Sequence, residues 1–498
     1  MHGRTTSLGC IIAVAAGTAV LAAPPAYAAP PPPVNSCGET GFDPKDYPPE
    51  PIGPGNPPQL PPLPPLPDRV VIPVPYPSIE LVPVPDPPPN NTRVQAEPSA
   101  DPCADPCPDL TDATESPTTG SADHLPFPRI EIDPQPETIP IPIPGPGGTP
   151  PPAPAVTAAE SGPTTVPPVA PALGHVEVVS QLTGPGSENR TDKRWQVDGT
   201  DLGIMWESKP GEVAVVFGDS FGKGWEFGVV GGDDWRSNVL GHSTDTDLSD
   251  GMTLDSMVQD SRCHAAELLP SRKIKNWETT VIPTSGFAID DRQYMSYMSI
   301  RRWSTIPGMW WTNYGGIAYS DDNGSTWVKD EHAKWDNVFG FSKFQVSTMV
   351  PAGEYVYMFG TVNGRAGQVG LARVPKADVL NKTAYQYWVN GTWAPVGSNE
   401  ATPIADGMAG ELSVHHDDAR GLWRMAYLDP LRGDIVLREA NSPQGEWTAP
   451  STLIDTAEYP KTYGGFIHPW STANELYFTV SEWDSYNVYL VKAELRSS

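Results

Sequence analysis

The stretch from Ala29 to about Leu173 is dominated by proline, in runs such as PPQLPPLPPLPDRVVIPVPYP and IPIPIPGPGG, and proline thins out afterwards. Proline has no backbone N–H to donate, and the apolar residues between these prolines are too sparse to offset the entropy lost on folding. Residues 29–173 are therefore expected to be disordered, or extended as polyproline II at about 3.1 Å per residue. Such a region serves either as a stalk or as a tail without a specific role.

Residues 1–28 have the pattern of a secretory signal peptide. A basic start, MHGR, precedes the apolar run LGCIIAVAAGTAVLA, and Ala26-Tyr27-Ala28 forms an A-x-A cleavage site. The apolar run is too short to span a bilayer stably, and no later segment approaches the roughly 20 apolar residues that a span needs. We therefore expect a secreted protein, free or held at the cell wall, without a membrane-spanning segment, and we expect a monomer.

The net charge limits which molecules the protein can bind, and the cysteines indicate disulfides. A formal net charge of −28 repels phosphate, which excludes a nucleic-acid binder, whereas a neutral polysaccharide is not repelled. The cysteines beyond the signal peptide are Cys37, Cys103, Cys107 and Cys263. Outside the cell these are expected to form disulfides, and the sequence leaves all three pairings open. The alternative for Cys103-x-x-x-Cys107, half of a zinc site, lacks partner histidines nearby.

Residues 174–498 have a different pattern, in which aromatic and apolar strands alternate with turn residues as far as the C-terminus. The strands recur in sets, each with a strand ending in Gly or Asp, a loop, and a second apolar strand. The sets can be anchored near Val213, Tyr294, Tyr355, Trp423 and Leu476. Four-stranded units at this period are typical of propeller blades. The sequence therefore predicts an all-β, five-bladed β-propeller over residues 174–498.

A local motif points to the same architecture. Residues 320–327, SDDNGSTW, fit the Asp-box S-x-D-x-G-x-x-W of glycan-acting propellers, and 441–447 is a degenerate relative. The motif predicts a hairpin turn in which Asp322 accepts backbone hydrogen bonds, Gly324 supplies a positive φ and Trp327 packs below. It favours the fold and carries no reaction of its own.

The stretch GTDLGIMWESKPGEVAVVFGDSFG predicts a β-hairpin that turns at Lys209, Pro210 and Gly211. A hairpin centred on Pro210 places Asp201 opposite Asp219, although like charges opposed in a sheet are destabilising. Paired carboxylates at one mouth are what glycoside hydrolysis requires, because one acts as acid and the other as base or nucleophile. The repulsion between the two carboxylates is expected to raise the pKa of one of them, which then stays protonated near neutral pH. The alternative is that each aspartate caps a turn.

Other candidates to bind sugar are Trp235, Arg236, Asn238, Glu411 and His468. Each has a structural alternative: a hydrogen-bond cluster that locks the loop for 235–238, a structural carboxylate for Glu411, and a structural histidine for His468. Glu411 is also a candidate third acid. His468 lies far from His415 and His416 in the sequence, and these histidines lack ligand spacing, so no metal is expected. Aromatic candidates for stacking on sugar are Trp310, Trp311, Tyr314, Tyr463 and Trp470.

The motifs GTDLGI, VFGDSFG and WRSNV resemble those of glycoside hydrolase family 183, formerly domain of unknown function 4185, over about Val176–Ser498. The resemblance implies a five-bladed propeller and endo-acting, inverting hydrolysis of D-arabinan in arabinogalactan and lipoarabinomannan. It implies that Asp201 and Asp219 are the essential acids and that no cofactor is needed. Ser220 stands where threonine is common in the family.

The sequence thus favours a secreted endo-D-arabinofuranosidase, and three alternatives stay open. These are a glycan-binding propeller without activity, a structural or protein-interaction propeller, and a hydrolase of another furanoside such as L-arabinan. Inversion also sets a geometric demand. It needs carboxyls about 6.5–9.5 Å apart, farther than directly opposed residues provide, so a bulge near Gly203 or Gly218 is expected to shift the register.

Overall fold

The computed structural model describes residues 32–45, 70–84, 91–94, 101–108, 130–144, 160–161, 169–306 and 308–496, so the predicted signal peptide lies outside it. From Ala172 onward the protein is all-β, as predicted, apart from helix α1 (Thr191–Trp195) and short 3-10 turns at Lys376–Asp378, Lys382–Ala384 and Ser398–Glu400. Within the described ranges, no helix combines the length and the apolar character needed to cross a membrane.

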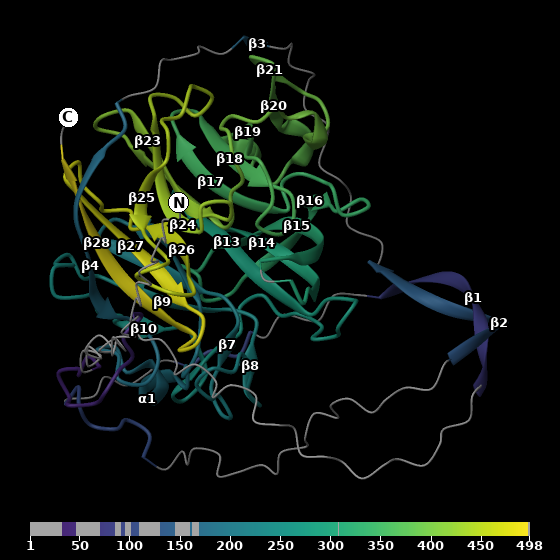
Figure 1. Ribbon diagram of the computed structural model, residues 1–498, viewed down its shortest axis with the longest axis horizontal. Coiled ribbons are helices and arrows are strands. Elements are labelled where there is room, and N and C mark those ends of the chain that lie inside the picture. The colour runs from purple at the N-terminus through teal and green to yellow at the C-terminus, as the bar shows by residue number, and fades with distance from the viewer. Residues whose placement is uncertain are drawn as a thin grey trace, which may run out of the picture. The chain divides into compact units, whose positions relative to one another are not determined.

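The strands form antiparallel sheets in which neighbours along the chain mostly lie side by side (Figure 1). The first sheet has the order β10 (Ser256–Met257), β9 (Val239–Ser243), β6 (Glu212–Phe217), β5 (Leu202–Lys209). The second is β13 (Thr280–Ile289), β14 (Arg292–Trp303), β15 (Trp310–Ser320), β16 (Val328–Asp336). The third is β17 (Val346–Ala352), β18 (Tyr355–Thr361), β19 (Gly370–Pro375), β20 (Gln386–Val389), β21 (Thr392–Ala394), β3 (Glu160–Ser161).

The fourth sheet is β22 (Leu412–Asp417), β23 (Leu422–Asp429), β24 (Asp434–Ala440), β25 (Ser451–Ile454). The fifth is β26 (Thr462–Ile467), β27 (Glu475–Glu482), β28 (Asn487–Arg496), β4 (Ala172–Gln181). Smaller two-stranded sheets pair β7 (Ser220–Phe221) with β8 (Trp235–Arg236), and β11 (Gln259–Ser261) with β12 (His264–Ala265).

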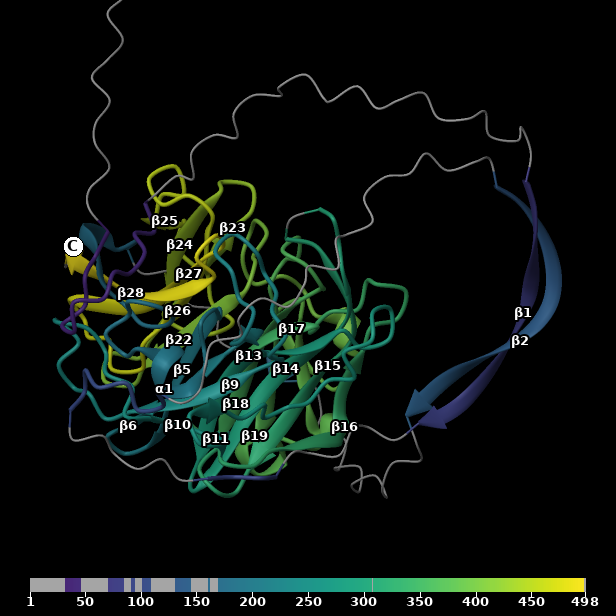
Figure 2. The same ribbon diagram turned by 90° about the horizontal axis from the view of Figure 1, so that it is seen from below.

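One strand of each large sheet faces its counterparts in the neighbouring sheets. The strands β5, β13, β17, β22 and β26 contact one another in this order, and β26 also contacts β5, so the series returns to its start. The fifth sheet is completed by β4, which comes from the beginning of the β-rich region and pairs with β28 near the end of the chain (Figures 1 and 2). The sheets therefore surround a common set of inner strands whose first residues share one end.

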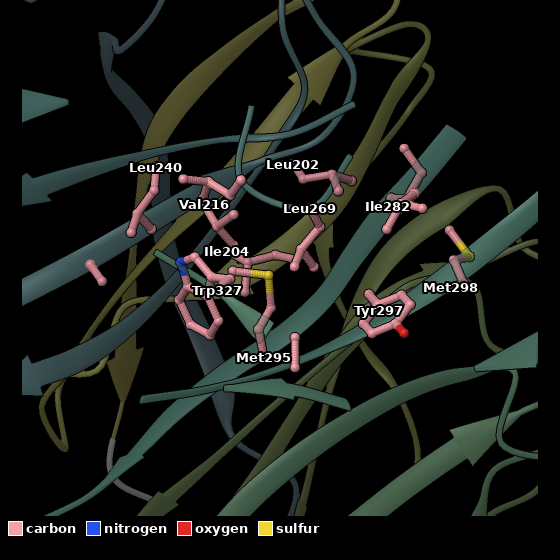
Figure 3. Close-up of a cluster of buried hydrophobic side chains, with 14 of the residues drawn as sticks. Leu202, Ile204, Val216, Leu240, Leu269, Ile282, Met295, Tyr297, Met298 and Trp327 are labelled. Atoms are coloured by element: carbon pink, nitrogen blue, oxygen red, sulfur yellow. The ribbon is translucent and has the colours of Figure 1, made fainter. Parts of the chain in front are cut away.

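Alternating apolar side chains explain how these strands pack. Leu202, Ile204 and Trp206 join one buried cluster, in which they meet residues of β13 and β14, and Figure 3 shows Leu202 and Ile204 directed into it. Met205, between them in the sequence, joins a second buried cluster. This alternation between two buried clusters has the period of two that is typical of a β-strand.

The Asp-box has the predicted structure of a hairpin turn, between β15 and β16. Asp322 Oδ1 accepts the backbone N–H of Thr326 at 2.8 Å, and Gly324 has φ +85°. Trp327 is buried and donates its indole N–H to the carbonyl of Gly324. Hydrogen bonds between the side chains of Asp322 and Trp327 and the backbone of the turn thus hold the hairpin in shape.

The prediction that residues 29–173 lack packed structure is wrong for several short segments. Disulfides join Cys37 to Cys103 and Cys107 to Cys263, which selects one of the three open pairings and ties this region to the β-rich domain. Segment 32–45 also packs on the domain, where Glu39 forms an ion pair with the buried Arg190. Composition missed these contacts because cysteines, a few polar side chains and the single ring of Phe42, which packs on a buried apolar cluster, hold the segments.

A second exception is the pair β1 (Val70–Val84) and β2 (Ile130–Pro144), which lie parallel to each other with Val70 opposite Ile130. The prolines of β1 occupy odd-numbered positions and those of β2 occupy even-numbered ones. Because backbone N–H groups alternate between the two sides of a strand, this parity lets every proline nitrogen face the outer edge. The missing donors then fall outside the ladder, which is where strands tolerate proline.

Candidate active site

The hairpin of β5 and β6 turns at Pro210 and Gly211, as predicted, but its register changes before it reaches the aspartates. Ile204 lies opposite Val216, whereas Leu202 lies opposite Phe217, so a bulge occurs at Gly203. Leu202 and Gly203 have φ of 73° and 74°. The N–H of Gly218 donates to the carbonyl of Asp201. Asp201 is therefore opposite Gly218 and not Asp219, so the predicted bulge near Gly203 is confirmed and removes the direct opposition.

Asp201 lies just before β5 and is partly buried. Its Oδ2 accepts a hydrogen bond of 2.9 Å from the hydroxyl of Tyr463 at the start of β26. Burial, followed by the negative charge of Asp219, raises the pKa of Asp201 to about 8. The nearby hydroxyl of Tyr486 lowers this pKa slightly, although Oδ1 has no partner of regular hydrogen-bond geometry among the described residues. The carboxyl of Asp201 is therefore protonated at neutral pH.

Asp219 follows β6 at the same end of the hairpin and is buried. Its Oδ1 accepts hydrogen bonds from Thr280 Oγ1 at 2.5 Å and from the indole N–H of Trp235 at 2.8 Å. Burial raises the pKa of Asp219 to about 6, while these two donors and the charge of Lys273 act in the opposite direction. Both donors favour the ionised form. Asp219 is thus the carboxylate of the pair at neutral pH. Trp235, a predicted sugar-binding residue, here binds Asp219.

A second carboxylate near Asp201 is held by arginine. Glu411, just before β22, accepts two hydrogen bonds of 2.9 Å from Nε and Nη2 of Arg365. The guanidinium of Arg365 lies 4.9 Å from the ring centre of Tyr463. The charge of Glu411 contributes to the raised pKa of Asp201. The structure therefore brings Glu411 to the pair, with its charge engaged by Arg365.

Arg236 and Asn238 lie close to the site, but their side chains bind the protein itself. Arg236 donates to the backbone carbonyls of Trp195 and Ala265 and forms an ion pair of 3.0 Å with Asp234. Asn238 is fully buried and uses both its amide group and its oxygen on the backbone of residues 268, 269 and 281. These contacts favour the alternative of a cluster that locks the loop.

His468 is not part of this cluster. It follows the far end of β26, five residues after Tyr463, which corresponds to roughly 16 Å along a strand. It is fully buried, and burial lowers its pKa to about 3, so it is neutral. In the part of the chain that the structure describes, no group of three or more His, Cys, Asp or Glu side chains is arranged to hold a metal ion.

Sequence reasoning missed several residues of the site, namely Thr280, Arg365, Lys273 and Tyr486. A signal for two of them was present in the repeating strand sets. Thr280 begins the inner strand β13, as Asp201 precedes β5, and Arg365 follows the second strand β18, as Asp219 follows β6. Aligning the strand sets at these positions would have identified Thr280 and Arg365 as candidate site residues. Lys273 and Tyr486 lie in loops of irregular length, for which the period gives no register.

Comparison with known proteins places the β-rich region in a family. A family model described as "Domain of unknown function (DUF4185)" matches residues 186–492. Notoamide biosynthesis cluster protein J from Aspergillus sp. (strain MF297-2) is 35% identical over 326 residues, which covers 60% of this chain and 84% of that protein. An uncharacterized 35.9 kDa protein from Mycolicibacterium smegmatis is 27% identical over 149 residues, 26% of this chain and 43% of that protein.

Among solved structures, a putative hydrolase from Bacteroides ovatus matches with a TM-score of 0.44 and 14% identity. The match covers 61% of this chain and 88% of that one.

Proposed function

The chain belongs to the DUF4185 family, and on that premise we propose that it is a secreted glycoside hydrolase, an endo-D-arabinofuranosidase acting on the D-arabinan of cell-wall arabinogalactan and lipoarabinomannan. The observation that carries the proposal is the pair Asp201 and Asp219, whose environments push their pKa values apart, to about 8 and about 6. Two carboxyls of opposite protonation state at one site are what acid–base cleavage of a glycosidic bond requires.

In the proposed mechanism, Asp201 is the general acid and Asp219 the general base. Asp201 gives its proton to the glycosidic oxygen as the bond to the anomeric carbon breaks. Asp219 takes a proton from the water that attacks this carbon from the opposite face, and the new hydroxyl completes an inverted product. Exchange of protons with solvent then restores both carboxyls. Tyr463 donates a hydrogen bond to Oδ2 of Asp201 and so fixes the orientation of the candidate acid.

The inverting outcome is supported by the bulge at Gly203, because a register that moves Asp219 away from direct opposition makes room for the attacking water. The D-arabinan substrate is supported by the resemblance of the motifs GTDLGI, VFGDSFG and WRSNV. We also propose that the five large sheets are the blades of a five-bladed β-propeller. The cyclic contacts of the inner strands and the closure by β4 and β28 support this architecture.

The test is to incubate the purified protein with mycobacterial arabinogalactan and, separately, with L-arabinan, and to analyse released oligosaccharides. We expect fragments from arabinogalactan only, with inverted anomeric configuration when the reaction is followed by NMR. The variants Asp201→Asn and Asp219→Asn should each release at least 1,000-fold less product while remaining folded. Release from L-arabinan alone would assign another substrate. No release from either polymer would favour a glycan-binding or structural role.

A further inference from the structure

One aromatic residue beside the carboxylate pair is unusually exposed. Trp483, in the turn between β27 and β28, is 49% exposed. Its ring centre lies 6.1 Å from that of Tyr463 and 6.2 Å from that of Tyr486. These are the tyrosines whose hydroxyls act on Asp201. Trp483 therefore presents a free aromatic surface directly next to the residues that hold the candidate acid.

The turn that carries Trp483 is anchored on several sides. The carboxylate of Glu482 accepts the backbone N–H groups of Asp484 and Ser485 at 2.9 and 2.7 Å. Asp484 forms an ion pair of 2.6 Å with Lys461, and its carbonyl accepts the N–H of Gly228 at 2.7 Å. A side chain on a fixed turn loses little conformational freedom when a ligand binds, so its contact surface is pre-organised.

A recess lies close to this turn. It is lined in part by Arg365, Leu428, Pro430, Lys461 and Thr462. Thr462 directly precedes Tyr463, and Lys461 is the ion-pair partner of Asp484, so the recess adjoins both the acid and the turn of Trp483. Its apolar walls suit the C–H faces of sugar rings, while the two cations and the hydroxyl suit their hydroxyl groups.

From these contacts we propose that Trp483 is the sugar-stacking platform of a binding subsite beside Asp201, and that the recess at Lys461 holds the adjoining sugars of the same glycan chain. The inference rests on the proposed function, since it assigns part of the substrate to this surface. An indole ring offers the largest aromatic face for stacking. Such a contact stabilises the bound substrate and the transition state equally, so it strengthens binding without accelerating the chemical step. Trp483 should therefore govern the affinity for a polymer and leave the chemical step unchanged.

Trp303 provides a matched control. It is 44% exposed, close to the value for Trp483, and packs edge-on against Trp310 at 5.9 Å. It ends β14, which lies antiparallel to β13, so it occupies the same end of the sheets as Asp219 after β6. It has neither of the two tyrosines as a ring partner. A general effect of removing an exposed tryptophan will appear in the alanine variants of both Trp303 and Trp483. An effect specific to the subsite will appear only in the variant of Trp483.

The experiment compares Trp483→Ala, Trp483→Tyr and Trp303→Ala in the full exported chain, with thermal melting to verify the fold. Steady-state kinetics on arabinogalactan should give about a tenfold higher KM for Trp483→Ala with kcat within twofold of the wild type. Trp483→Tyr should recover most of the affinity, and Trp303→Ala should match the wild type. Unchanged KM in Trp483→Ala, or equal losses in Trp303→Ala, would overturn the subsite.

Binding separates this inference from the hydrolase proposal. In an Asp219→Asn background, calorimetry with arabinogalactan should show about tenfold weaker binding when Trp483→Ala is added. If the wild type releases no oligosaccharide but this difference in binding is present, the hydrolase fails and the subsite stands. If hydrolysis is present and the binding of the two proteins is equal, the subsite fails and the hydrolase stands.

Discussion

Among single residues, Asp201 illustrates how position sets chemistry. It is partly buried and lies near a second carboxylate. Its hydrogen-bond partner is the phenol of Tyr463, which stays neutral because burial raises the pKa of Tyr463 well above its usual range. Asp219, only two residues beyond β6, instead receives two hydrogen bonds on one oxygen. Identical side chains thus acquire different protonation states from their neighbours.

This difference predicts the pH dependence of hydrolysis. The proposed mechanism requires Asp219 ionised and Asp201 protonated, so kcat/KM should rise through about pH 6 and fall through about pH 8. Removing one donor by Thr280→Val should move the acidic limb to higher pH, because the ionised form of Asp219 loses a hydrogen bond. The measurement is the initial rate of oligosaccharide release between pH 4 and 10. An acidic limb that does not respond to Thr280→Val would contradict the assignment of Asp219.

The same raised pKa predicts a cost in stability. Between the usual aspartate pKa near 3.8 and the value of about 8, the folded state binds more protons than the unfolded state, so stability contributed by Asp201 falls as pH rises through this window. Asp201→Asn removes this dependence. It should raise Tm at pH 8 but change it little at pH 4, by about 2 °C for each kcal/mol recovered. Calorimetry at the two pH values tests this, and an equal shift at both would contradict it.

At the scale of elements, the hairpin of β5 and β6 decides where the two carboxyls lie. The bulge at Gly203 offsets the strands, and Gly218 then faces Asp201 across the hairpin. A Cβ added at Gly218 would lie 2.3 Å from Asp201 Oδ1, too close for any side chain, whereas the backbone there has no positive φ. Glycine is needed at position 218 because it leaves space for the carboxyl of Asp201, and not because the backbone there requires a positive φ.

Gly218→Ala should therefore displace the carboxyl of Asp201 and lower kcat by at least 100-fold, since small misplacements at a reacting centre are costly. The fold should survive, because alanine adopts this backbone without strain. Gly397→Ala is the control, as a Cβ there meets nothing within 4 Å. Oligosaccharide release and thermal melting are measured on both variants. Near-normal turnover in Gly218→Ala would show that the close contact at Gly218 does not position Asp201.

Much of the strand arrangement was predictable from the sequence. The strand anchors at Val213, Tyr294, Tyr355, Trp423 and Leu476 all fall in the second strand of a large sheet. Alternation and turn residues are local properties, so they can be recognised one strand at a time. The partners of the carboxyls, such as Thr280 and Tyr463, come from other sheets, and only the closure of the inner strands brings them to Asp201 and Asp219.

For the whole molecule, the cysteines decide how the proline-rich region is connected. Cys107 and Cys263 are 156 residues apart, and their bridge encloses β4, β5, β6 and β9 in one covalent loop. Cross-linking so long a loop restricts the unfolded chain considerably. The composition of residues 29–173 gave no hint of this, because a disulfide depends on where the chain returns in space.

Replacing both partners, Cys107→Ser with Cys263→Ser, should lower the free energy of unfolding by about 2–4 kcal/mol. Urea denaturation of the variant and of the wild type, each with and without reductant, measures the loss. Reductant should destabilise the wild type more than the variant, which keeps only Cys37–Cys103. Equal stability of the two oxidised proteins would contradict a structural role for this bridge.

The bridge also sets the path of mechanical load. Tension applied upstream of Cys37 passes through Cys37–Cys103 and then, four residues later, through Cys107 into Cys263 between β11 and β12. The segment from 108 to 262 is a slack side branch of this path, and it contains Asp201, Asp219 and the β4 strand that pairs with β28. A pull applied before Cys37 therefore reaches the β-rich domain at Cys263 without running along the hairpin of the two carboxyls or along β4.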